Sequence, residues 1–152
     1  MHIKIIAIAK TKEKFYEAAE AEYLKRLGSF TKAEFEILPA SRADFDAKVI
    51  FEEAEKILDK IKPTDFVVAL DKEGSQMSSL DLAKKLDKWL SSSKNLVFVI
   101  GGTYGLSQQV LDRADFVWSF SQLTFTHEMV RTILLEQIYR AFTILNNKPY
   151  HY

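Results

Sequence analysis

The chain has 152 residues, with 21 basic and 21 acidic side chains and therefore a formal net charge of zero. Because it contains no cysteine, disulfides, thiolate metal sites and cysteine nucleophiles are excluded. Its length and its balance of 47% hydrophobic and 28% charged residues are typical of one soluble globular domain, expected here over residues 1–152. The first apolar run is only about seven residues long, too short for a signal peptide or a membrane span, so we expect a cytoplasmic protein.

Short β-branched runs alternate with amphipathic helical segments along the whole chain. The pattern predicts strands at 3–9, 33–38, 66–70, 96–100 and 116–120, and helices at about 13–27, 44–61, 79–91, 107–114 and 127–146. The alternating segment 33–38 indicates an edge strand, Pro63 prevents the second helix from continuing, and Ser78 or Ser79 is expected to cap the third. The third helix is expected to end at Ser91–Ser93. This alternation predicts an α/β fold with a mainly parallel sheet.

In a parallel sheet, ligands bind beyond the carboxyl ends of the strands. Three such ends carry conspicuous residues: 70–74, 100–105 and 119–126. A site assembled from these three loops is the expectation that follows from the pattern alone.

The segment Gly101-Gly102-Thr103-Tyr104-Gly105 contains three of the five glycines in the chain. Clustered glycine permits positive φ angles and a close approach of the backbone to a ligand. The spacing is neither the dinucleotide fingerprint nor a phosphate-binding loop with its lysine. The segment is therefore either a tight structural turn or part of a site for a ligand without a phosphate chain.

The last predicted helix is apolar on most of its circumference, which favours a dimer contact along one side. Two pairs at i, i+4 spacing stand out on it, His127 with Arg131 and Glu136 with Arg140. Each pair is open to two interpretations: an ordinary helix start or intrahelical ion pair, or a functional role.

The chain ends in Pro149-Tyr150-His151-Tyr152, whereas most tails are polar and frayed. The tail is expected to dock, either for stability or to present stacking rings. The three histidines lack metal-ligand spacing, so no metal site is predicted. Asp71 and Glu73 are interpreted as solvated loop acids.

From residue 66 onward, several ordered motifs together resemble the RlmH family, which comprises large-subunit rRNA pseudouridine methyltransferases of the SPOUT class. The motifs are Leu70-Asp71 after a strand, Val99-Ile100-Gly101-Gly102-x-x-Gly105-Leu106-Ser107, Leu123-Thr124-Phe125-Thr126-His127-x-Met129-Val130-Arg131, Leu135-Glu136-Gln137-Ile138-Tyr139-Arg140-Ala141 and Pro149-Tyr150-His151. The resemblance is weaker over residues 1–65 but extends over essentially the whole chain.

The resemblance implies a single SPOUT domain with a deep C-terminal trefoil knot, a homodimer, and S-adenosyl-L-methionine as cofactor. The implied reaction is methylation of N3 of a pseudouridine in a large-subunit rRNA stem-loop, at the subunit interface of the assembled ribosome. By motif matching, the cofactor-binding positions are Leu70, Gly102, Ser121, Gln122, Leu123, Thr124, Phe125 and Thr126.

Two further hypotheses concern the chemistry. His151, with Tyr150 nearby, is a candidate catalytic residue that reaches the cofactor of the other protomer, since histidine is the natural general base near neutral pH. Arg131 and Arg140 are candidates for RNA binding. The family commonly ends Tyr-His followed by a basic residue, whereas here Tyr152 follows His151, so a cation that could contact phosphate is absent at that position.

Two other classes of function stay open from the sequence: a non-catalytic ribosome-binding protein, and a small-molecule enzyme that uses the same crevice. The zero net charge does not exclude RNA, because the charge is unevenly distributed. Residues 1–76 carry 13 basic and 15 acidic groups, whereas residues 77–152 carry 8 and 6. Neutrality instead indicates weak affinity for generic RNA.

Overall fold

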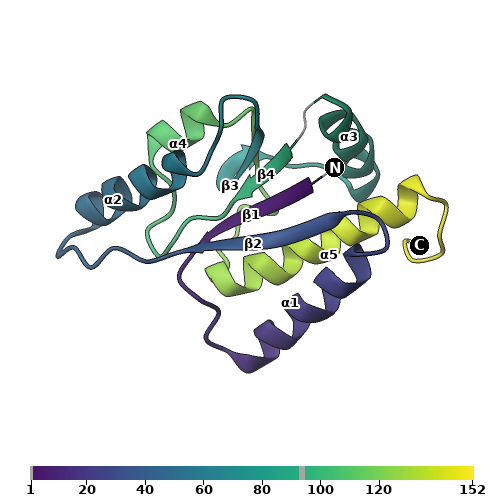
Figure 1. Cartoon of the computed structure of the whole chain (residues 1–152), viewed down its shortest axis with the longest axis horizontal. Coiled ribbons are helices and arrows are strands. Elements are labelled where there is room, and N and C mark those ends of the chain that lie inside the picture. The colour runs from purple at the N-terminus through teal and green to yellow at the C-terminus, as the bar shows by residue number, and fades with distance from the viewer. Residues whose placement is uncertain (1, 93–94) are drawn as a thin grey trace.

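Five strands form one sheet in the order β2-β1-β4-β3-β5 (Figure 1). The computed structural model describes residues 2–92 and 95–152. The strands are β1 (His2–Ile8), β2 (Lys32–Leu38), β3 (Phe66–Ser75), β4 (Asn95–Val99) and β5 (Phe116–Trp118). Every strand pairing within these residues is parallel, so the carboxyl ends of all five strands lie at one edge of the sheet.

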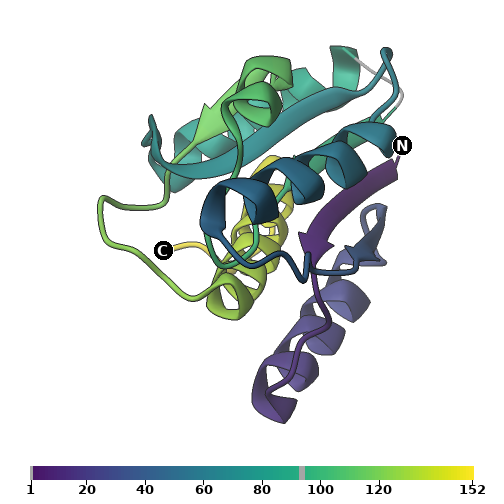
Figure 2. The same cartoon turned by 90° about the vertical axis from the view of Figure 1, so that its left-hand side faces the viewer.

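Helices cover both faces of the sheet. They are α1 (Lys14–Leu27), α2 (Asp46–Asp59), α3 (Ser79–Ser92), α4 (Gln108–Arg113) and α5 (His127–Leu145). Helix α5 packs between α1 and α3 on one face, while α2 and α4 lie together on the other, as Figures 1 and 2 show from two sides.

Alternating side chains of the inner strands divide between two buried cores. In β1, Ile3 and Ile5 face α1, α3 and α5, whereas Ile6 and Ile8 face α2 and α4. All four are at most 2% exposed. Because β1 and β4 are largely buried on both faces, residues 3–8 and 96–99 are all apolar except Lys4, as is usual for inner parallel strands.

The structure confirms the predicted α/β class, with β2 at an edge and β4 at the centre of the sheet. Ser78, rather than Ser79, caps α3, because its Oγ accepts a hydrogen bond from the N–H of Asp81 at 3.1 Å. The predicted end of that helix includes Ser93, which lies outside the described residues. The trefoil knot stays a prediction.

One strand is longer than expected. β3 was predicted to end at Leu70 but continues to Ser75, with a register shift between these two residues where both pair with Trp118. Gly74 permits this close approach, since a Cβ there would lie 2.7 Å from the carbonyl oxygen of Val117. The predicted loop 70–74 is therefore an irregular strand extension beside the site.

The apolar circumference of α5 is largely explained by its position in the fold. Its residues Leu134, Leu135 and Ile138 are fully buried under the sheet and between two helices. Most of the apolar surface of α5, from which a dimer contact was expected, is therefore buried within the chain itself. Across the described residues, no helix combines the length and apolarity required to cross a membrane.

Candidate functional site

A cavity of about 800 Å³ lies at the carboxyl ends of β3, β4 and β5. Its walls come from the three segments predicted from the sequence, completed by the first turn of α5. The lining residues are Leu70–Lys72, Ile100–Leu106, Trp118, Phe120, Ser121, Leu123–Glu128 and Val130. The size is that of a pocket for a small molecule.

Seven of the eight predicted cofactor positions line this cavity. Gln122 is the exception, because it lines a separate polar cleft of about 500 Å³ with Lys72, Glu73, Gly74 and Gln76. Lys72 borders both spaces, so the cleft adjoins the cavity.

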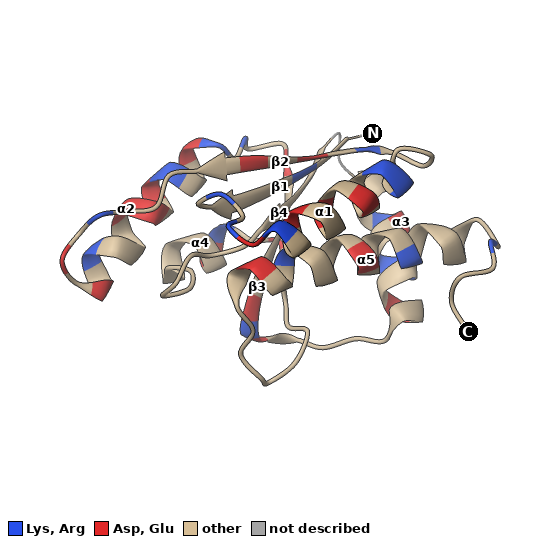
Figure 3. Cartoon of the chain, turned by 90° about the horizontal axis from the view of Figure 1, so that it is seen from below, with Lys and Arg blue, Asp and Glu red and all other residues tan. Residues whose placement is uncertain are grey.

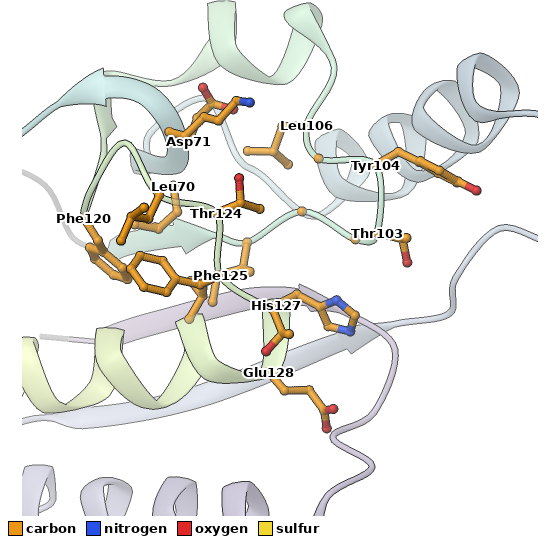
Figure 4. Close-up of a pocket in the computed structure, with 18 of the residues that line it drawn as sticks. Leu70, Asp71, Thr103, Tyr104, Leu106, Phe120, Thr124, Phe125, His127 and Glu128 are labelled. Atoms are coloured by element: carbon orange, nitrogen blue, oxygen red, sulfur yellow. The ribbon is translucent and has the colours of Figure 1, made fainter.

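The cavity has an apolar end and a more polar end. Figure 4 shows Leu70, Phe120 and Phe125 gathered at one end, with Thr103, Tyr104 and His127 toward the other. The loop between β5 and α5, which forms one wall, carries no charged residue (Figure 3). Such a site favours an uncharged planar ring at its apolar end over a phosphate chain.

Gly101 and Gly102 lack room for a side chain because other parts of the protein lie close to them, and no ligand is required to explain these glycines. A Cβ at Gly101 would lie 2.8 Å from the carbonyl carbon of Gly105, and one at Gly102 would lie 2.6 Å from Oε1 of Glu53. Gly105 differs, since its φ of +81° favours glycine while the space around its Cα is open. The N–H of Gly105 closes the turn on the carbonyl of Gly102 at 3.1 Å.

The first turn of α5 forms the other wall. Thr126 caps the helix, its Oγ1 accepting from the N–H of Met129 at 3.3 Å. His127 follows, and burial, with the Arg131 charge as a second cause, lowers the pKa of its imidazole. The ring is therefore neutral at physiological pH, which suits its position at the positive end of a helix dipole.

Arg131 does not face the solvent or the cavity. Its side chain is 1% exposed, and its guanidinium donates to the carbonyls of Ile8 at 2.7 Å and Ala9 at 2.8 Å and to Oγ1 of Thr11 at 3.0 Å. The guanidinium is thus enclosed in the folded chain, with Nη1 and Nη2 bonded to residues 8–11 and Nε buried without a hydrogen-bond partner. This position gives no support to RNA binding by Arg131, which stays a prediction.

Arg140 belongs to a cluster at the other end of α5. It donates to Oε1 of Glu136 through both Nε and Nη2, and its guanidinium lies over the ring of Tyr150, 4.8 Å from the centroid. Its Nη1 lies 3.3 Å from Nδ1 of His151. The predicted ion pair thus exists and also holds the C-terminal tail. Arg140 is partly exposed, and RNA binding by it stays a prediction.

Tyr150 anchors the tail through its hydroxyl. It donates to Oε1 of Glu136 at 3.0 Å and lies 3.5 Å from the hydroxyl of Tyr23 on α1. Burial, followed by these two hydrogen bonds, raises the pKa of Tyr150 well above its ordinary value. The phenol therefore stays protonated and can act as a donor but not as a base.

The contact with Arg140 occupies one ring nitrogen of His151. A guanidinium can only donate, so in this contact Nδ1 of His151 is the acceptor and its lone pair is not free. A role as base requires that Arg140 release Nδ1 or that the ring change tautomer.

The tail cluster and the cavity lie at opposite ends of α5 (Figure 1). The 13 residues between His127 and Arg140 correspond to about 20 Å of helix. Within one chain, the predicted catalytic residues therefore do not meet the predicted cofactor positions.

The parts played by Glu136 and Tyr23 were not predicted from the sequence. Glu136 was noted only as one half of an ion pair, yet it accepts from both Arg140 and Tyr150. Tyr23 reaches the tail from 127 residues away along the chain, and no sequence signal indicates that contact. No group of three metal-ligating side chains occurs among the residues described, 2–92 and 95–152.

Comparison with known proteins gives concordant matches. A family model described as "Predicted SPOUT methyltransferase" matches residues 1–151. Proteins named ribosomal RNA large subunit methyltransferase H are similar over nearly the full length of both chains: one from Limosilactobacillus reuteri is 46% identical over 99% of each chain, and one from Dictyoglomus thermophilum is 42% identical over 100% of each. A solved structure of a probable methylase family protein from Haemophilus influenzae Rd KW20 has a TM-score of 0.55 and 14% identity, covering 99% of this chain and 70% of that one.

Proposed function

Since the chain belongs to the SPOUT methyltransferase family, we propose that it transfers a methyl group from S-adenosyl-L-methionine to ribosomal RNA of the large subunit. The observation that carries this proposal is the cavity at the strand ends, whose walls contain Leu70, Gly102 and most of the segment 121–126. The names of the full-length relatives supply the substrate class.

The residues present fit this cofactor. Leu70, Phe120 and Phe125 offer an apolar end for adenine, while the backbone of the glycine turn and of segment 121–126 offers donors and acceptors for polar groups. The cofactor has no phosphate groups, and the glycine turn has no lysine of a phosphate-binding loop. When bound, S-adenosyl-L-methionine supplies an electrophilic methyl group on a sulfonium.

The tail supports the finer proposal that the acceptor is N3 of a pseudouridine. Methylation of this nitrogen requires that its proton leave, and His151 is the residue for that task once Arg140 releases Nδ1. Tyr150 keeps its proton and donates a hydrogen bond, while Glu136 holds Arg140 and Tyr150 together. Most of the remaining rate enhancement comes from holding the methyl group of the cofactor and N3 of the pseudouridine in a reactive orientation.

The active enzyme in this proposal is a homodimer. The distance of about 20 Å along α5 separates tail and cavity within one chain, so the tail of one protomer serves the cavity of its partner. Leu123, Tyr104 and Met129 lie at the cavity and α5 and are 70%, 49% and 38% exposed, which suits them for burial against a second copy.

Methyl transfer from labelled cofactor to ribosomes that lack the modification tests the proposal. Assembled ribosomes, separate large subunits and free rRNA are compared, and we expect incorporation into the assembled ribosome, at a pseudouridine N3. Turnover without RNA would indicate a small-molecule enzyme, and failure to bind the cofactor would indicate a non-catalytic binding protein. A His151→Ala variant that retains the parental rate would remove that residue from the mechanism.

A further inference from the structure

Two side chains on one face of α5 reach the connection between β1 and α1. Oε1 of Glu128 accepts from the backbone N–H of Lys12 and, at 3.2 Å, from that of Glu13. Three residues later, Arg131 donates to the carbonyls of Ile8 and Ala9 and to the hydroxyl of Thr11. Residues 8–13 are thus tied to the start of α5 at two positions about one helical turn apart.

The buried charge of Arg131 is matched by protein groups. Glu20 on α1 is 8% exposed and accepts from Oγ1 of Thr11 at 2.7 Å, and its carboxylate charge stabilises the guanidinium. The hydroxyl of Thr11 therefore links the two charged groups. Burying a guanidinium is costly unless its charge and donors are compensated. Nη1 and Nη2 have partners while Nε is buried without one, so loss of the contacts to residues 8–11 would leave more buried donors unmet.

The end of β1 contacts the cavity wall that carries the glycine turn. The N–H of Ile100 donates to the carbonyl of Ile6 at 2.9 Å, and Cγ2 of Ile8 lies 3.3 Å from the position of a Cβ at Gly102. The glycine turn thus rests on the same residues that Arg131 holds. On the opposite side, the turn of α5 that carries Arg131 presents His127 and Val130 to the cavity.

We infer that Arg131 is a positioning residue for the cofactor cavity, which sets the distance between the glycine turn and the first turn of α5 through the carbonyls of Ile8 and Ala9. Its bonds hold the backbone of Ala9 at a φ of +64°, a conformation that a non-glycine residue keeps only when its surroundings impose it. The inference rests on the proposed function, because the cavity is taken as the cofactor site.

An Arg131→Gln variant tests this inference by its affinity for S-adenosyl-L-methionine, measured by titration calorimetry at a temperature where the protein stays folded. We expect the dissociation constant to rise by about tenfold or more, because displacement of a wall by about 1 Å weakens a preorganised site. The KM for the cofactor should rise in parallel. Arg131→Lys, which keeps the charge but not the fork of donors, should recover part of the affinity.

Arg113 provides a matched control away from the cavity. Its guanidinium also donates to two backbone carbonyls, those of Lys62 at 2.9 Å and Asp65 at 3.2 Å, which precede β3 at the opposite edge of the sheet. Arg113→Gln should lower the melting temperature while leaving the cofactor dissociation constant within about twofold of the parent. Equal losses of affinity in the two variants would overturn the inference, since general destabilisation would then explain both.

If the Arg131→Gln protein does not fold, a milder variant allows the same inference to be tested by cofactor affinity. Thr11→Val removes the hydroxyl that joins Arg131 to Glu20 without changing the size of the side chain, and Thr11 does not line the cavity. We expect a threefold to tenfold weaker affinity, of the order that loss of one network member produces. Parental affinity in this variant, or in a folded Arg131→Gln protein, would overturn the positioning role. A parent protein without affinity for the cofactor would instead overturn the proposed function.

Discussion

His127 lies where the protein environment opposes a positive charge. It is the first residue of α5 and lines the cavity proposed to receive a sulfonium cation. Burial and the Arg131 charge lower the pKa of its imidazole, so the folded protein disfavours protonation relative to the unfolded chain. This contribution to stability is present above the unfolded pKa of about 6.5 and is lost as the pH falls through the lower folded pKa.

We therefore expect the parent protein to lose thermal stability on acidification below about pH 6.5 more steeply than a His127→Gln variant, which cannot titrate at this position. Melting temperatures of both proteins across this range provide the measurement. Cofactor affinity should fall in the same range only in the parent, because an imidazolium repels a sulfonium. Parallel stability curves for the two proteins would contradict this prediction.

The glycines of the 101–105 turn should respond differently to substitution. Gly101→Ala places a methyl group 2.8 Å from backbone atoms of Gly105, so the turn must open, and we expect cofactor affinity to fall at least about tenfold. Gly105→Ala meets no atom and should cost only the strain of a positive φ, about 1 kcal/mol of folding stability. Titration with the cofactor and denaturant unfolding distinguish the two. Equal effects of the two substitutions would show that packing in the turn does not control the site.

Among the helices, two N-terminal caps allow a loss of folding stability to be distinguished from a loss of cofactor binding. Thr126 caps α5 inside the cavity wall, and Ser107 caps α4, its Oγ accepting from the N–H of Val110 at 3.2 Å. Ser107 does not line the cavity. Replacement of either residue by Ala should cost about 1 kcal/mol, or about 2–4 °C in melting temperature for a chain of this size.

Only Thr126→Ala should also weaken cofactor binding, because its helix start forms part of the cavity. Melting curves with and without S-adenosyl-L-methionine measure both effects, since a bound ligand raises the melting temperature in proportion to its affinity. The shift on adding cofactor should be smaller for Thr126→Ala than for Ser107→Ala. Equal shifts would indicate that the first turn of α5 does not contact the ligand.

For the whole molecule, the separation of the tail and the cavity along α5 leads to a prediction about how two chains share a site. If the tail of one protomer serves the cavity of its partner, a Gly101→Ala chain and a His151→Ala chain should complement each other. In an equal mixture, about half of the dimers are mixed, and each mixed dimer has one intact site of two. Methyl transfer, assayed at a cofactor concentration well below the dissociation constant of the Gly101→Ala protein, should therefore recover to about a quarter of the parental rate after the two chains are unfolded and refolded together.

Each variant refolded alone is the control and should stay inactive. If the site lies within one chain, every site in the mixture keeps one of the two defects, and the mixture should be as inactive as its components. Recovery would thus support both the dimer and the exchange of tails. It would also explain why Glu136, Arg140 and Tyr150 form a rigid cluster so far from the cavity, since a docked tail is presented to a partner without a further ordering cost.

Local sequence patterns were enough to predict the order and type of the ten helices and strands found within residues 2–92 and 95–152, the parallel sheet and the three segments that line the cavity. These follow from local periodicity and from the rule that parallel strands end at one edge, neither of which depends on long-range contacts. The family could also be identified, because its motifs are ordered along one chain. The extension of β3 to Ser75 was missed, since a strand irregularity depends on the strand beside it.

The roles of the individual charged side chains depend on contacts that form only when the chain is packed. Arg131 and Arg140 have the same chemistry and lie on the same helix, yet one is buried against the end of β1 and the other holds the tail. Helical spacing specifies which residues share a face, but the neighbours of that face come from residues more than 100 positions away. Burial and hydrogen-bond partners are thus properties of the packed chain, and they distinguish an arginine that the fold encloses from one that stays partly exposed beside the tail.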